Sequence, residues 1–579
     1  MIEYRVSLAQ RSAHLFEVEA RFPVENRPAI DLRLPIWTPG SYLIREYQRH
    51  LQDLLCTDEA GRTLRTTKVE KAAWRVATQG SLILIARYRI YAHEVTVRTA
   101  HLDETHAFWN GACLFLYVEE LRDRSIELRI EVPDGWRVST ALDAAAGSWT
   151  CRDYDTLVDS PCEVGPHSIV EFSAAGRPHT LTVWGRTASG PYDLERLRAD
   201  LVKIAEAQAA LFDGLPYDRY AFLLHLVPGA HGGLEHASSS TLLASPFDFC
   251  SEKKYTDLLE LVSHELFHCW NIKRIRPAAL ERFDYQREAL TRSLWVIEGW
   301  TSYYDRLLLR RAGLVSAKSY LATVADKFGR IAATPGRLHQ SLEQASFDAW
   351  IKFYRPDENT ANSAVSYYLK GSLVALLLDL EIRRRTRGAR SLDDALRALW
   401  SEYGRSGHAY PDEAVQPLCE RVSGVSLDDL WSRWVRSCEE LDATDAFAFV
   451  GLTLRPARSD EPSGGWLGAN LRQEGERLRV VEVRADGPAL VGGLCPGDQI
   501  LACDGFRVDE ASLKEHIAVR RPGDLVELTL FRRDQLAPAR IALGALPASK
   551  WEIVPIENAP PEARDAFQSW LSEPWESLA

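Results

Sequence analysis

The chain is poor in methionine, in paired cysteines and in long hydrophobic runs. Met1 is the only methionine among 579 residues, and the ten cysteines form no Cys-x-x-Cys pair. Scattered cysteines of this kind indicate reduced, buried thiols and argue against a structural zinc site built from cysteine. No stretch has the length and apolarity of a membrane span, so we expect no membrane-spanning segment.

Basic residues are fewer than acidic residues. Lys and Arg together number 69 against 81 Asp and Glu, and the formal net charge is -12. Without a basic stripe, a nucleic-acid partner is not expected. Residues 1–6 alternate like a strand and lack the basic region and apolar stretch of a secretory signal. Together with the cysteine pattern, this predicts a cytoplasmic location.

The period of the hydrophobic pattern divides the chain into four parts. Residues 1–175 alternate with period two and predict a β-rich domain, an antiparallel sandwich or a similar sheet. Residues 176–446 are dominated by helical patterns and predict an α+β catalytic domain. Residues 447–545 mix short strands with one helix, and no fold is assigned to the tail at 546–579. The predicted fold class is therefore multidomain α+β.

One motif points directly to chemistry. His264-Glu265-x-x-His268 lies in a run that is typical of a helix. Residues four apart share a helix face, so the two imidazoles can bind one zinc ion. Glu265 lies beside them to accept a proton from the attacking water. The rest of the run is strongly apolar, and charged side chains on a buried helix need partners, which a metal supplies.

A catalytic zinc takes three protein ligands and keeps one position open. A metzincin would have glycine at 271 and histidine at 274, but the chain has Asn271 and Arg274 and lacks an internal methionine for a Met-turn. The third ligand is then expected to be a downstream carboxylate, either Glu288 or Glu298. Glu298 is favoured because its flanks are apolar and aromatic, whereas polar and charged residues surround Glu288.

Three further segments resemble motifs of the gluzincin aminopeptidases. Glu298-Gly299 resembles their Asn-Glu-Gly motif, Tyr368-Leu369-Lys370-Gly371 their Tyr-x-Lys-Gly motif, and residues 232–236 their Gly-x-Met-Glu-Asn motif. The resemblance implies that the Tyr368 hydroxyl hydrogen-bonds the oxyanion. It also implies that a strand at Gly232 and Gly233 aligns the substrate, while Glu235 binds the free α-amine.

The combination of segments resembles one family in particular. With residues 35–42, 264–277 and 298–304 and a trailing PDZ-like unit, the chain resembles the glycyl aminopeptidase family of PDZ-containing gluzincin zinc metallopeptidases. This implies a thermolysin-like, mostly helical catalytic domain at 176–446 with Zn²⁺ as cofactor. The implied substrates are peptides with a free N-terminus, from which Gly, Ala or another small residue is released.

The third part of the chain resembles a PDZ domain of the bacterial protease type. Gly465-Trp466-Leu467-Gly468 matches a carboxylate-binding loop, and residues 493–500 match the core signature. Because such domains add a peptide strand to a sheet edge, a C-terminal peptide is a second expected partner. The alternative is a PDZ fold that serves only as a structural cap or a dimer surface, and the oligomeric state stays open.

Several of these residues could instead have a purely structural role. Tyr368 can be a core aromatic, with Tyr367 as the competing neighbour, and Glu235 can be an ordinary exposed strand residue. Structural roles are expected for five nearby residues: His225, His231, His236, Tyr303 and Tyr304. For the whole chain, the alternatives are a PDZ-guided zinc endopeptidase and a non-catalytic peptide-binding scaffold.

Overall fold

The computed structural model describes residues 1–25, 27–185, 192–457, 464–548 and 550–578. These residues divide into two units. The first unit comprises residues 1–290, 304–315 and 396–411, and the second comprises residues 291–303, 316–395 and 412–579. Within the described ranges, no helix combines the length and the apolarity that crossing a membrane requires.

A seven-stranded sheet opens the first unit. Alternate residues of β1 (Ile2–Gln10) and β2 (Leu15–Pro23) are buried, as the period-two pattern predicts. All neighbouring strands are antiparallel except β1 and β10, so the antiparallel expectation is wrong for that pair. The strand order is β12 (Asp143–Ala145), β13 (Ser148–Cys151), β10 (Ile126–Glu131), β1 (Ile2–Gln10), β2 (Leu15–Pro23), β7 (Ile83–Tyr91) and β4 (Leu51–Asp58).

Two smaller sheets and two short helices, α1 (Gly111–Leu114) and α2 (Tyr154–Val158), complete the β-rich part. The four-stranded sheet has the order β11 (Arg137–Thr140), β14 (Cys162–Gly165), β9 (Ala107–Trp109) and β8 (Ala100–Leu102). The three-stranded sheet has the order β3 (Ile30–Arg33), β6 (Ala73–Val76) and β5 (Thr66–Glu70). Their apolar side chains form one core, which also contains Tyr285 from much later in the chain.

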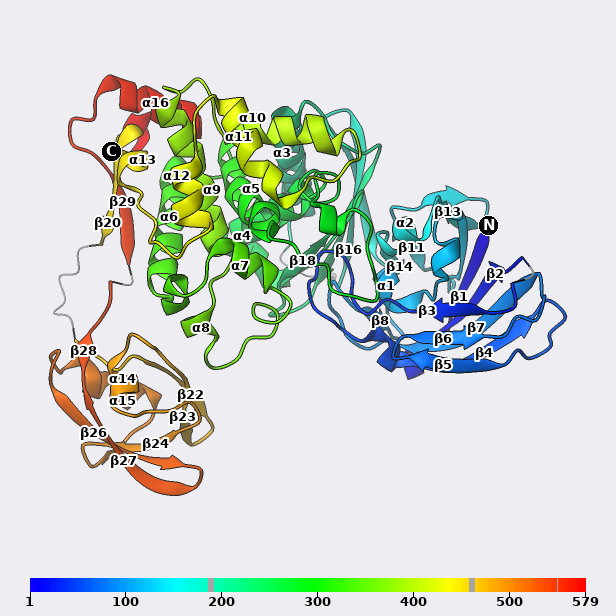
Figure 1. Cartoon of the computed structure of the whole chain (residues 1–579), viewed down its shortest axis with the longest axis horizontal. Coiled ribbons are helices and arrows are strands. Elements are labelled where there is room, and N and C mark those ends of the chain that lie inside the picture. Colours follow the sequence, from blue (N-terminus) through cyan, green and yellow to red (C-terminus); the bar gives the residue numbers. More distant parts are fainter. Residues whose placement is uncertain (26, 186–191, 458–463, 549, 579) are drawn as a thin grey trace. The chain divides into compact units, whose positions relative to one another are not determined.

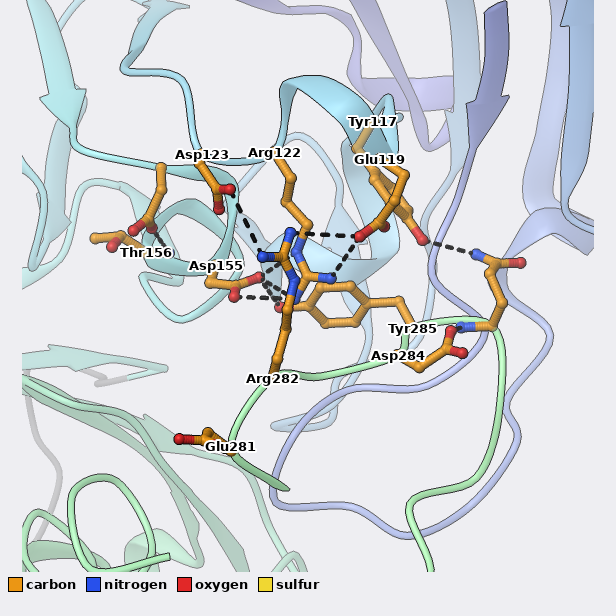
Figure 2. Close-up of polar contacts among 12 residues, drawn as sticks. Tyr117, Glu119, Arg122, Asp123, Asp155, Thr156, Glu281, Arg282, Asp284 and Tyr285 are labelled. Atoms are coloured by element: carbon orange, nitrogen blue, oxygen red, sulfur yellow. Dashed lines mark hydrogen bonds and ion pairs between the residues drawn. The ribbon is translucent and has the colours of Figure 1, made fainter. Parts of the chain in front are cut away.

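The segment around Tyr285 is anchored in this core by polar contacts (Figure 2). The Tyr285 hydroxyl donates to Asp155 Oδ1 over 2.9 Å, and the Arg122 guanidinium donates two hydrogen bonds of 2.9 Å to the same carboxylate. Arg122 also lies 4.7 Å above the Tyr285 ring. The Trp37 indole donates to the Asp284 carbonyl over 2.9 Å. These bonds fix the chain shortly after the His-Glu-x-x-His motif against the β-rich part.

A five-stranded sheet follows in the first unit. Its order is β15 (Ser168–Ala174), β16 (Arg177–Trp184), β17 (Tyr220–Leu226), β19 (Ser239–Ala244) and β18 (Gly232–Glu235). Every residue of β17 is buried. Helix α3 (Leu194–Phe212) contacts β15, and helix α4 (Glu252–Phe267) contacts β18 and β19. The edge strand β18 therefore lies beside the helix that carries the candidate zinc ligands.

The second unit is mainly helical. A π-helical turn, η6 (Trp295–Gly299), runs directly into α5 (Trp300–Arg311), whose later residues belong to the first unit. The other helices are α6 (Ala317–Ala332), α7 (Leu342–Phe347), α8 (Thr360–Ser363), α9 (Leu369–Arg385), α10 (Leu392–Leu399), α11 (Val415–Ser423), α12 (Asp428–Leu430) and α13 (Thr444–Phe449). Of these, α10 also continues into the first unit.

A PDZ-like sheet with its own apolar core follows α13 in the chain. Its strands are β22 (Ala469–Glu474), β23 (Arg477–Val483), β24 (Gln499–Cys503), β26 (Leu525–Arg532) and β27 (Gln535–Ala542), with β25 (Phe506–Arg507) paired to β24. Helices α14 (Pro488–Val491) and α15 (Glu510–Ala518) accompany it, and β21 (Gly465–Trp466) pairs with β28 (Gly544–Ala545). The β-rich, helical and PDZ-like parts confirm the predicted fold class.

The C-terminal tail returns to the helices instead of ending at the PDZ-like sheet. Strand β29 (Trp551–Pro555) pairs antiparallel with β20 (Leu452–Pro456), which precedes that sheet in the chain (Figure 1). Helix α16 (Pro561–Leu571) follows, and its Trp570 indole donates to the Tyr303 hydroxyl over 3.1 Å. Tyr303 in turn donates to Asp379 of α9 over 2.7 Å. The tail is thus tied by buried hydrogen bonds to α5 and α9.

Candidate active site

Helix α4 presents the His-Glu-x-x-His motif at its C-terminal end. His264 and Glu265 lie in its last turn, and His268 is the residue that caps it. The two imidazole rings have their centroids 4.6 Å apart, as the spacing of four residues predicts. Glu265 is 5% exposed and His268 is 1% exposed. A carboxylate and two imidazoles are therefore held together in a largely buried place.

Each histidine is oriented by a contact to its Nδ1 atom. His264 Nδ1 lies 3.1 Å from a carboxylate oxygen of Asp305, and His268 Nδ1 lies 2.8 Å from the Asn271 carbonyl oxygen. A ring that donates from Nδ1 presents Nε2 as its ligand atom, which is the usual arrangement around zinc. Asp305 was not predicted as a site residue, although its place seven residues after Glu298 was a usable signal.

Two further hydrogen bonds fix the end of α4. The Ser263 hydroxyl donates to the Asp305 carbonyl over 2.8 Å, and the Gln208 side-chain amide donates to the Ser263 carbonyl over 2.7 Å. Ser263 and Gln208 are fully buried. Because these bonds occupy the backbone beside His264, they hold the histidine-bearing turn in place.

Strand β18 approaches the helix where Glu265 lies. A Cβ atom placed on Gly233 would come within 2.1 Å of a Glu265 carboxylate oxygen. Only a residue without a side chain fits at this distance. Because β18 pairs on one side with β19 and ends the sheet, its other edge is available to a peptide strand. The glycine therefore allows an extended chain to pass close to the Glu265 carboxylate.

We expect Gly233→Ala to lower kcat by about 100-fold or more while the protein stays folded, because a general base contributes about that much. The three atoms nearest to the new methyl group all belong to the Glu265 side chain, so the carboxylate must move and the fold need not. Steady-state kinetics and thermal melting measure the two effects. A normal kcat would contradict this placement of Gly233, and so would an unfolded protein.

Glu235 is buried at the end of the same edge strand. It is 3% exposed, and its Oε1 atom has no hydrogen-bond partner among the described residues. Its ligand atoms, those of Glu265 and those of His268 all lie within 4.8 Å of one another. The alternative prediction, that Glu235 is an ordinary exposed strand residue, is therefore wrong. A buried carboxylate oxygen without a partner is costly and favours a cationic ligand.

A loop of the β-rich part lies against the Glu235 side chain. Gly40, in the segment 35–42, has a φ of 85°, and a Cβ atom there would come within 2.5 Å of the Glu235 carboxylate. Arg98 donates a hydrogen bond of 3.3 Å to the Gly233 carbonyl. The β-rich part thus contributes to the wall of the site, and it leaves room for the Glu235 side chain through a glycine in the left-handed region.

In the second unit, Glu298 lies in the π-helical turn η6 and is 2% exposed. Single π-helical turns are frequent at functional sites, because they redirect a side chain within a helix. Glu288, the competing candidate, is an exposed residue of the first unit. A third ligand must be buried with the metal, so the two environments favour Glu298 over Glu288.

Tyr368 precedes α9 and lies near Glu298. Burial and the negative charge of Glu298 raise the pKa of Tyr368 well above its usual value. The phenol is therefore protonated and able to donate a hydrogen bond. The neighbouring Tyr367 is 0% exposed and packs against Phe353 and Tyr368, whereas Tyr368 is partly exposed. Of the two tyrosines, Tyr368 is the one that a substrate can reach.

The two motif glycines of this unit touch each other. A Cβ atom on Gly299 would come within 2.6 Å of the Gly371 Cα atom, and one on Gly371 within 3.0 Å of the Gly299 Cα atom. The backbone of η6 therefore packs directly on the first turn of α9. Since Glu298 precedes one glycine and Tyr368 precedes the other by three residues, this contact sets the separation of the two functional side chains.

The remaining histidines have other surroundings. His236 contacts Asp159 over 3.1 Å, and Lys273 contacts the same carboxylate over 2.6 Å. Burial would raise the pKa of Asp159, but Lys273 and His236 lower it to about 2. This places His236 in a buried structural network. His231 is exposed, and His225 is buried beside a different glutamate.

Comparison with known families gives three matches. A model of the Peptidase M61 N-terminal domain matches residues 3–166, a model of the M61 glycyl aminopeptidase matches residues 257–374, and a PDZ domain model matches residues 465–543. The helix α4 motif and the segment of Tyr368 both fall within the second match. The third match agrees with the PDZ-like sheet of the second unit.

Solved structures and curated proteins also resemble the chain. An aminopeptidase N family protein from Idiomarina loihiensis is similar with a TM-score of 0.92 and 32% identity over 99% of this chain and 100% of that one. An M1 zinc metallopeptidase from Deinococcus radiodurans shares the fold, with a TM-score of 0.50 and 14% identity over 76% of this chain and 94% of its own.

Two curated relatives match a smaller part. Probable periplasmic serine endoproteases, DegP-like, from Pseudomonas fulva (strain 12-X) and Rhizobium meliloti (strain 1021) are each 29% identical over 127 and 134 residues. These matches cover 20% and 23% of this chain and 26% of each relative. The chain therefore spans only about a quarter of the length of these curated relatives.

Proposed function

Because the chain belongs to the M61 glycyl aminopeptidase family, we propose that it is a zinc-dependent aminopeptidase of the gluzincin type. Its substrates would be peptides with a free N-terminus, from which it removes Gly, Ala or another small residue. The observation that carries the aminopeptidase assignment is the buried Glu235 carboxylate at the end of the edge strand β18, whose Oε1 atom has no hydrogen-bond partner among the described residues.

The proposed zinc ligands are His264, His268 and Glu298. The two imidazoles lie together at the end of α4, and the sequence pattern gives the buried Glu298 as the third ligand. Two imidazoles and one carboxylate are a common catalytic zinc set. The contacts of Asp305 and Asn271 to the Nδ1 atoms support the fit, because they orient Nε2 as the ligand atom. When bound, zinc would supply a Lewis acid that activates water and polarises the scissile carbonyl.

The chain's own residues would carry the proton transfer and part of the charge stabilisation. Glu265 accepts the proton of the attacking water and then delivers it to the leaving amine. Tyr368, protonated because of its raised pKa, donates a hydrogen bond to the oxygen on which negative charge develops. The close approach of Gly233 to Glu265 supports a substrate strand on β18 with its scissile bond next to that base.

Glu235 would decide where the peptide is cut. Its carboxylate binds the α-ammonium group of the substrate, so the first peptide bond is the one that reaches Glu265. The cation also compensates a buried negative charge, which makes the interaction worth more than an exposed ion pair. A peptide with a blocked amine loses this interaction and gains a steric conflict at the buried end of β18.

We expect Glu235→Gln to lower kcat/KM for free aminoacyl substrates by about 10- to 100-fold, because a charge-assisted hydrogen bond is worth about 1.5–3 kcal/mol. Most of the loss should be in KM, since the group binds substrate in the ground state and in the transition state. The measurement is steady-state kinetics with a glycyl and an alanyl substrate.

Glu252→Gln is the matched control for charge, because Glu252 is an exposed residue of the same helix as the motif and pairs with Arg196. It should leave kcat/KM unchanged. If Glu235→Gln behaves like this control, or if it loses activity equally on N-acetylated peptides, Glu235 does not bind the α-amine.

The deciding experiment is hydrolysis of free and N-acetylated peptides with and without a chelator. Chelator-sensitive release of Gly or Ala from free amines alone supports the proposed aminopeptidase. Equal cleavage of blocked peptides would identify a PDZ-guided zinc endopeptidase instead. Absence of bound zinc and of all hydrolysis would favour a non-catalytic peptide-binding scaffold.

The PDZ-like sheet offers a second peptide site. Strand β22 is at the edge of its sheet, and α15 contacts it, so a peptide can add beside β22 as PDZ ligands do. We propose a C-terminal peptide as its partner, with its carboxylate near the turn that follows Trp466. We also propose a cytoplasmic location, because the ten cysteines are all free thiols.

A further inference from the structure

A second cluster of metal-ligating residues lies in the first unit, away from α4. It consists of His106, which precedes β9, Glu163 of β14 and His225 of β17. Their ligand atoms all lie within 4.8 Å of one another. The side chains of all three are at most 1% exposed. The sequence does not predict this cluster, because its members come from three distant segments.

The Glu163 carboxylate of this cluster has only histidines as close partners. Every ion-pair contact of the Glu163 carboxylate in the described part of the chain is with an imidazole, and none is with lysine or arginine. A fully buried carboxylate without a lysine or arginine beside it is costly and favours a bound cation.

Both oxygens of the Glu163 carboxylate face imidazole nitrogens at short range. His225 Nε2 lies 2.9 Å from Glu163 Oε2 with hydrogen-bond geometry. His106 Nε2 lies 2.7 Å from Glu163 Oε1, without the alignment of a hydrogen bond between them or to any other described residue. Two close atoms that do not align as donor and acceptor can direct their lone pairs to a common centre. Two imidazoles and a carboxylate are the ligand types that zinc prefers.

Neighbouring side chains hold the rings in ligand-like orientations. His101 Nδ1 lies 3.0 Å from His106 Nδ1, and Trp184 stacks on the His106 ring with centroids 3.8 Å apart. His106 is thereby held with Nε2 toward Glu163. Engagement of one ring nitrogen by a neighbour is the usual support for a histidine that binds metal through the other.

A further histidine, His167, lies near the Glu163 carboxylate. His167 Nδ1 lies 3.9 Å from Glu163 Oε1 and has no hydrogen-bond partner in the part of the chain that the structure describes, although its side chain is fully buried. Its Nε2 atom lies 2.9 Å from the Ser139 hydroxyl. If Nε2 donates there, Nδ1 keeps its lone pair and faces the carboxylate. His167 can therefore complete a four-coordinate site after a small shift, as structural zinc requires.

We propose that His106, Glu163 and His225 bind a second, structural zinc ion, with His167 as the fourth ligand. The ion would join β14 of the four-stranded sheet and the residue before β9 to β17 of the five-stranded sheet. It would thus link the β-rich part to the sheet that carries the edge strand of the candidate active site. This role is separate from catalysis and does not depend on the proposed aminopeptidase activity.

Metal stoichiometry of the full-length protein tests the proposal. Elemental analysis after dialysis should find two equivalents of zinc in the natural protein and one in the His264→Ala/His268→Ala double variant. The remaining equivalent should disappear when Glu163→Gln is added to that double variant. A double variant without zinc, or one whose zinc survives Glu163→Gln, would overturn the second site.

Two further measurements test whether zinc is lost through misfolding and whether it is bound only at the protein surface. His179 is a buried histidine whose ring nitrogens lie 2.9 Å from the Arg177 carbonyl and 3.0 Å from the Tyr217 hydroxyl. His179→Gln should therefore keep both equivalents. X-ray absorption of the double variant should show imidazole nitrogens at about 2.0–2.1 Å from zinc. Coordination by water and carboxylate alone would overturn the proposal even if Glu163→Gln fails to fold.

The same experiments separate this inference from the proposed function. Zinc that is retained in the double variant supports the second site whether or not the natural protein hydrolyses peptides. A natural protein that holds one equivalent and loses it with the His264 and His268 substitutions supports the catalytic zinc and rejects the second site.

Discussion

Glu265→Gln should retain zinc and lose peptide hydrolysis almost completely. Loss of a general base lowers kcat by about 100- to 10,000-fold, and no other carboxylate on α4 faces Gly233 at the distance of Glu265. The amide has nearly the same volume as the carboxylate, so the packing against β18 is kept. The measurements are kcat with a glycyl substrate and zinc content by elemental analysis.

The combination of results is what tests the mechanism. A variant that has lost both zinc and activity would show only that the site had been disrupted. A variant that keeps zinc and more than a tenth of the natural kcat would rule out Glu265 as the base. Glu252→Gln, on the same helix but exposed, should keep zinc and full activity.

The sequence predicted those parts of the site that depend on neighbours along the chain. Prediction of the two histidines and Glu265 needed only the 3.6-residue period of a helix. The placement of Glu235 depended on packing that the sequence does not encode locally. Its carboxylate is covered by Gly40, from a loop almost two hundred residues earlier, and a single sequence carries no information on that contact.

The absence of tertiary contacts from a single sequence also explains which residues were not predicted. Asp305 orients His264, but it acts across two helices whose packing a helical pattern does not specify. Glu163 and His225 lie in strands that read as ordinary buried segments, and only tertiary structure brings them within 2.9 Å. The choice of Glu298 over Glu288 rested on flanking composition, and the burial of Glu298 and the exposure of Glu288 now support it. Glu298 as the third ligand stays a prediction.

Close packing of two glycines should make the second unit unusually sensitive to one methyl group. Gly299 and Gly371 come from different helices, and their backbones are in contact without side chains between them. The same residues follow Glu298 and Tyr368 in the two motifs. A substitution that separates these backbones must also move the proposed metal ligand away from the proposed oxyanion donor.

Gly299→Ala should therefore lower the free energy of unfolding by about 3 kcal/mol and remove most of the activity, because overpacking against backbone cannot be relieved by a rotamer change. Gly371→Ala is the graded control: its Cβ atom would meet the Gly299 Cα atom at 3.0 Å instead of 2.6 Å, and alanine favours the helix by about 1 kcal/mol. Denaturant unfolding and kcat should show a much smaller loss for Gly371→Ala. Equal losses in the two variants, or none in Gly299→Ala, would mean that this contact does not position Glu298 and Tyr368.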